Sequence, residues 1–120
     1  QPLYAVAAED DHIAPWSQAF RTLHHIAADK RFVLSSSGHI LGIVNPPVKP
    51  PRRHYWVDTA HRADKATQWR ERAGHHTGSW WDDWMAWLKP RAGDLNTARP
   101  AFDERYPKLG DAPGTYVLEP

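Results

Sequence analysis

Residues 3–39, LYAVAAEDDHIAPWSQAFRTLHHIAADKRFVLSSSGH, decide the fold class of this chain. The short apolar run at residues 3–8 ends in an acidic cluster, which is typical of a buried parallel strand that leads into a polar loop. Pro15 suits the first position of a helix, where its missing N–H is not needed. From Trp16 onward, apolar residues recur at i, i+4, i+7 and i+11, which predicts an amphipathic helix lasting to about residue 28.

A second short strand is predicted at residues 31–34, followed by a serine-rich turn and then His39. The order of strand, acidic loop, helix, strand and histidine loop indicates a βαβ unit, in which both strands run parallel. Loops at the carboxyl ends of parallel strands lie at the same edge of a sheet. We therefore expect an α/β fold in which the side chains of Asp11 and His39 can meet.

The remaining sequence is less regular. Residues 45–53 (NPPVKPPRR) carry four prolines and predict an extended surface connector. A short helix is expected at residues 67–73, and another from an N-cap at Ser79 to a stop at Pro90. Beyond Pro90 we expect an irregular tail tied to the body by aromatic side chains, namely Phe102, Tyr106 and Tyr116.

Composition excludes several classes of function. The 120 residues include 15 Lys and Arg and 14 Asp and Glu. The resulting formal charge of +1 argues against nucleic acid as a partner. No apolar run approaches the roughly 20 residues of a membrane span, so we expect a soluble, cytosolic protein. There is no cysteine, hence no thiol nucleophile, and the histidine spacing predicts no metal site.

Gln1 stands where an initiator Met is expected, so we interpret the chain as part of a longer one.

Asp11 and His39 are the main catalytic candidates. A carboxylate at one strand end and a histidine at the next are what α/β-hydrolases use to orient and polarise a general base. The alternative is that Asp11 caps a loop and His39 is a turn histidine with its hydrogen bonds satisfied. Spacing alone leaves both interpretations open.

Four segments together resemble class I poly(3-hydroxyalkanoate) synthases: residues 9–16 (EDDHIAPW), 32–47 (FVLSSSGHILGIVNPP), 75–88 (HHTGSWWDDWMAWL) and 112–117 (APGTYV). The resemblance implies the C-terminal part of an α/β-hydrolase catalytic domain, with its last strands and helices and an irregular Pro- and Trp-rich extension. Residues 1–48 would then carry the Asp and His loops. Residues 49–120 would be the connector, the Trp-rich helix and a tail packed on the same domain.

The resemblance also implies a function. The family polymerises (R)-3-hydroxyacyl-CoA, here expected to be 3-hydroxybutyryl-CoA, through a Cys-His-Asp triad whose cysteine lies upstream of this chain. It implies Asp11 and His39 as catalytic residues, and it makes His12 a candidate for the substrate site or else a loop histidine. No cofactor is expected. The implied partners are the substrate, the growing polyester and the rest of the synthase chain, in a homodimer at the surface of cytoplasmic storage granules, and the fragment alone should be inactive.

Two rival functions stay open. One is a fragment of a serine esterase or depolymerase of the same fold, and the other is a non-catalytic granule-binding or oligomerisation module. The basic stretch at residues 49–54 either attracts CoA phosphates or is a solvated connector. Strand edges left exposed in an isolated piece should favour dimerisation.

Overall fold

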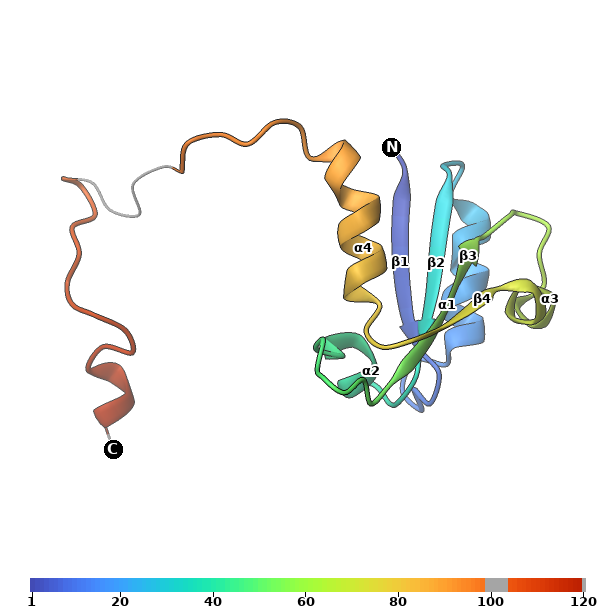
Figure 1. The fold of residues 1–120 in the computed structure, drawn as a ribbon, viewed down its shortest axis with the longest axis horizontal. Helices are drawn as coiled ribbons and strands as arrows, with labels where there is room; N and C mark the ends of the chain where they lie inside the picture. Colours follow the sequence, from blue (N-terminus) through green and yellow to red (C-terminus); the bar gives the residue numbers. More distant parts are fainter. Residues whose placement is uncertain (99–103, 120) are drawn as a thin grey trace.

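A computed structural model describes residues 1–98 and 104–119 as a mixed α/β fold built on one four-stranded sheet. The sheet has the strand order β1-β2-β3-β4, with helices on both faces (Figure 1). β1 (Leu3–Ala8) and β2 (Lys30–Ser35) pair in parallel, with Leu3 opposite Lys30 and Ala8 opposite Ser35. The predicted parallel βαβ unit is therefore present.

The second half of the sheet is antiparallel and was not predicted. β3 (His54–Thr59) runs antiparallel to β2, and β4 (Gly74–Thr77) runs antiparallel to β3. Buried and less buried residues alternate along β3, with Tyr55 and Val57 buried toward one face of the sheet. This alternation is the usual pattern of a strand with one buried face, and it begins directly after the proline-rich connector.

One face of the sheet is covered by α1 (Trp16–Thr22), its short 3₁₀ continuation (Leu23–His25) and α3 (Ala66–Arg72). Aromatic rings from α1, β2 and α3 form the centre of this core, since Phe20, Phe32 and Trp69 are at most 1% exposed and contact one another. The first helix is shorter than predicted. It ends at Thr22 and its 3₁₀ turn at His25, because Ile26 is already extended.

The opposite face is covered by α4 (Trp81–Leu88) and its N-cap Trp80, which pack on β1, β2 and β3 through Trp80, Trp84 and Trp87. Asp83 ties this helix to the sheet. Its carboxylate accepts hydrogen bonds from the Tyr4 hydroxyl at 2.8 Å and from Nε of Arg31 at 2.8 Å. The predicted Trp-rich helix is present, and its last turn passes into a 3₁₀ turn (Lys89–Arg91) that contains Pro90.

The connector and the tail lack strands and α-helices in the described residues. Residues 45–53 have no helix or strand, as predicted, and a four-residue helix, α2 (Leu41–Val44), precedes them. Beyond Arg91 the described residues lead away from the sheet and include the 3₁₀ turn Tyr116–Leu118 (Figure 1). Tyr106 and Tyr116 are 64% and 81% exposed, and Phe102 lies outside the described residues. That these side chains tie the tail to the body stays a prediction.

No helix in residues 1–98 or 104–119 is both long and apolar enough to cross a lipid bilayer.

Candidate functional site

The loops that follow β1 and β2 are joined to each other at one end of the sheet. The backbone N–H of Glu9 donates to the Ser35 carbonyl at 2.8 Å, and the N–H of Asp10 donates to the Ser37 carbonyl at 3.1 Å. These bonds continue the parallel pairing past the last strand residues. The loop that carries Asp11 is therefore held directly beside the loop that carries His39.

Asp11 and His39 are in contact through their side chains. Nδ1 of His39 lies 2.8 Å from Oδ2 of Asp11. An ionised carboxylate can only accept hydrogen bonds, so Nδ1 is the donor, and in the neutral imidazole this tautomer leaves Nε2 as the acceptor. The Asp11 side chain is 6% exposed and the His39 side chain 46% exposed, so the imidazole remains open to a reactant.

The second carboxylate oxygen of Asp11 organises its own loop. Oδ1 accepts hydrogen bonds from the backbone N–H groups of Ala14 at 2.8 Å and Ile13 at 2.9 Å. The hydrogen bond from Ala14, followed by that from the His39 ring, lowers the pKa of Asp11 below its usual value. Asp11 is therefore ionised at neutral pH and both caps its loop and orients His39, so the two interpretations left open by the sequence do not exclude each other.

Neighbouring acids do not compete for this histidine. Glu9 is engaged by Arg70, whose Nη2 donates to its carboxylate at 2.6 Å while the guanidinium lies over the Trp56 ring. Asp10 is exposed on the loop. Of the three consecutive acids, Asp11 is the one that contacts His39.

His12 is exposed and does not join the pair. In the described residues its ring makes no hydrogen bond with Asp11 or His39. The loop hydrogen bond considered as an alternative for His12 is also absent from the described residues. A role for His12 at the substrate site stays a prediction.

One further feature positions the site and was not predicted from the sequence. α2 begins two residues after His39, and it lies against the end of β1 because Gly42 allows a very close approach. A Cβ on Gly42 would lie 2.5 Å from the Ala8 Cβ. Gly42, three residues after the candidate catalytic His39, was the feature of the sequence that could have indicated this close approach, because glycine has no Cβ.

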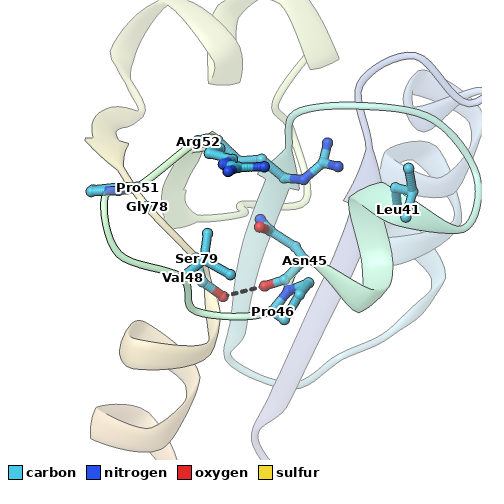
Figure 2. A pocket seen from close by; sticks show the side chains of 9 residues that line it. Leu41, Asn45, Pro46, Val48, Pro51, Arg52, Gly78 and Ser79 are labelled. Carbon is cyan, nitrogen blue, oxygen red and sulfur yellow. Dashed lines mark hydrogen bonds between the residues drawn. The ribbon is translucent and has the colours of Figure 1, made fainter.

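A pocket of about 210 Å³ lies next to α2 and is shown in Figure 2. It is formed by α2, the proline-rich connector and the turn before α4. Its lining includes Leu41, Asn45, Arg52, Arg53 and Ser79. The two arginines give it a positive charge, in keeping with the anion-binding alternative for the basic stretch. Within the described ranges, no group of three or more His, Cys, Asp or Glu side chains gathers as metal ligands do.

Comparison with known proteins gives a consistent result. No protein-family model matches the chain. The chain is 41% identical over 117 residues to the poly(3-hydroxyalkanoate) polymerase subunit PhaC of Cupriavidus necator, which is 97% of this chain and 20% of that protein. It is 42% identical over 118 residues to poly(3-hydroxyalkanoate) polymerase 1 of Ectopseudomonas oleovorans, with 98% and 21% covered. For the polymerase subunit PhaC of Rhizobium etli, the identity is 36% over 118 residues. The chain thus spans about one-fifth of the length of these relatives.

Proposed function

We propose that this chain, which belongs to the poly(3-hydroxyalkanoate) polymerase family, is the C-terminal part of such an enzyme. It spans about one-fifth of the length of the relatives that it matches. The proposed reaction is transfer of an (R)-3-hydroxyacyl group from CoA, expected to be 3-hydroxybutyryl, onto a growing polyester. The observation that carries this proposal is the 2.8 Å contact between Asp11 and His39, which supplies an oriented general base.

The nucleophile in this proposal is a cysteine outside the chain, because the chain itself contains none. Nε2 of His39 takes the thiol proton, and the thiolate attacks the thioester carbonyl of the substrate to form an acyl-enzyme. CoA leaves as a thiol after it receives the proton from the imidazolium. Asp11 accepts the Nδ1–H bond throughout and stabilises the positive charge that develops on the ring.

We further propose that the chain is the last part of an α/β-hydrolase domain, with residues 1–48 contributing the site loops and 49–120 the connector, the Trp-rich helix and the tail. The parallel β1–β2 unit and its joined loops support this assignment. We also propose a homodimer in the cytoplasm at the surface of polyester granules. The relatives are polymerases by name, which favours a polymerase over a serine esterase.

Substitution in the full-length protein tests the catalytic assignment. Asp11→Asn and His39→Ala should each lower the rate of CoA release by about 10²- to 10⁴-fold. Asp10→Asn is a matched control, since it removes a neighbouring carboxylate that is exposed and does not contact His39. CoA release is measured with a thiol reagent. If Asp11→Asn behaved like Asp10→Asn, the pair would have no catalytic role and the non-catalytic module would be the better interpretation.

A further inference from the structure

The short helix α2 depends on contacts with the rest of the chain for its stability and its position. It has four residues, and an isolated helix of that length is unstable in water. The last carbonyls of any helix lack partners within the helix. In α2 and its C-cap, the carbonyl oxygens of Ile43, Val44 and Asn45 are among these groups, and each accepts a hydrogen bond from elsewhere in the chain.

Three consecutive residues, from the turn before α4 to its first residue, supply those donors. The Ser79 hydroxyl donates to the Asn45 carbonyl at 2.6 Å, which Figure 2 shows as a dashed line. The indole N–H of Trp80 donates to Ile43 at 3.1 Å, and that of Trp81 donates to Val44 at 2.9 Å. Together, Ser79, Trp80 and Trp81 form what we call the α2 clamp.

Both sides of the clamp are anchored in the fold. Asn45 is 1% exposed, and its side-chain amide donates to Oγ of Ser35 at the end of β2. Ser79 is also buried, and its oxygen accepts the backbone N–H of Trp81 at 3.1 Å. The Trp80 ring packs in the core against Val33 and its neighbours. The C-terminal end of α2 is therefore fixed relative to the sheet.

From this fixed end, a short chain of contacts leads to His39. The N–H of Val44 donates to the Ile40 carbonyl at 2.9 Å, and the N–H of Gly42 donates to the Gly38 carbonyl at 2.8 Å. The second of these bonds spans His39 itself. Because Gly42 lies against Ala8, α2 is also pressed on the end of β1, three residues before Asp11.

We propose that the α2 clamp is a positioning device for catalysis, which holds the His39 backbone at the place where its ring meets Asp11. The proposal rests on the proposed function, because it assigns to the clamp a role in the same acyl transfer. Trp81 is the most informative member. The residue is 39% exposed and lies outside both core clusters. Its ring contacts those of Trp80 and Trp84, which a phenylalanine ring can also contact, whereas the hydrogen bond to α2 requires the indole N–H.

The test is Trp81→Phe in the full-length protein, which removes the N–H donor and keeps an aromatic ring. Loss of one hydrogen bond that acts on the position of the base should lower kcat by about five- to tenfold, with KM unchanged. Trp87→Phe is the matched control. Trp87 lies on the same helix, and its indole nitrogen has no hydrogen-bond partner among the described residues.

A second measurement separates positioning from a general loss of structure. In an Asp11→Asn background, the imidazole has already lost its oriented partner, so adding Trp81→Phe should lower kcat by less than twofold. A full five- to tenfold effect in that background would show that the clamp acts independently of the pair and would overturn the proposal. So would equal kcat values for Trp81→Phe and Trp87→Phe. If Asp11→Asn and His39→Ala themselves kept full activity, the proposed function would fail instead, which the same set of variants reveals.

Discussion

The contact between Gly42 and β1 makes a stability prediction whose sign runs against ordinary helix propensity. Gly42 lies in α2, where alanine normally stabilises a helix by up to about 1 kcal/mol. Here, however, a Cβ would lie 2.5 Å from the Ala8 Cβ and 3.0 Å from the Ser37 carbonyl oxygen. Carbon atoms in contact normally lie about 3.5 to 4.0 Å apart, so either α2 or the end of β1 must move.

Overpacking of this kind costs about 1–3 kcal/mol. An approach of 2.5 Å places Gly42→Ala in the upper part of this range, about 2–3 kcal/mol, so after a gain of about 1 kcal/mol in helix propensity we expect the free energy of unfolding to fall by about 1–2 kcal/mol. With a urea m-value of about 2 kcal/mol/M, the unfolding midpoint falls by about 0.5 to 1 M. Tryptophan fluorescence reports this transition, because Trp69 is in the core and Trp80 is buried against the sheet.

Gly38→Ala serves as the control for this measurement. The nearest atom to a Cβ on Gly38 is the Asp10 carbonyl oxygen at 3.7 Å, an ordinary contact distance. Gly38→Ala should therefore shift the midpoint much less than Gly42→Ala. A midpoint for Gly42→Ala equal to or above that of Gly38→Ala would refute the argument that α2 is seated by close packing on β1.

Three further changes have defined outcomes. Asp83→Asn removes the carboxylate that accepts hydrogen bonds from Tyr4 and Arg31 of the sheet. It should lower the free energy of unfolding, measured by urea titration, by about 1–2 kcal/mol. Asp82→Asn is the control, because Asp82 is exposed on α4 and its substitution should have little effect. Because the pKa of Asp11 is lowered in the fold, its carboxylate contributes stability above about pH 4 that is lost as the pH falls through the lower folded value. The urea midpoint of Asp11→Asn should accordingly fall less steeply below about pH 4 than that of the parent chain, and an identical slope would contradict the assignment. Phe20→Ala empties the centre of the aromatic core and should cost about 3–5 kcal/mol, seen as loss of far-UV circular dichroism well below the parent's melting temperature.

The sequence predicted the part of the structure that depends on local pattern and parallel pairing. The strand at residues 3–8, the strand at residues 31–34 and the helix before Pro90 are present within a few residues of their predicted bounds. The proximity of Asp11 and His39 followed from one rule, that the carboxyl ends of neighbouring parallel strands share an edge. The end of the first helix was wrong because apolar spacing continues past Thr22, while the backbone turns into a 3₁₀ segment.

Features that depend on long-range contact could not be predicted in the same way. β4 is four residues long and wholly exposed, and its sequence GHHT has no apolar alternation, so only its pairing with β3 makes it a strand. The hydrogen bonds from Trp80 and Trp81 to α2 join residues 37 positions apart. The spacing of the tryptophans predicted a packed helical face, and it carried no information about where the indole N–H groups would point.

Because β3 reverses the strand direction, insertions and deletions should disturb the site in some segments of the chain and leave it unchanged in others. β3 leads the chain away from the end of the sheet where the Asp11 and His39 loops lie, and β4 brings it back, so that Ser79 arrives beside Asn45. Adding or removing one residue within β4 would turn its side chains over and displace Ser79 along the strand direction. Insertions at residues 92–98, which are exposed and carry no helix or strand, would leave that end of the sheet untouched. Natural variation in length should therefore be concentrated after α4 and be rare between residues 54 and 79.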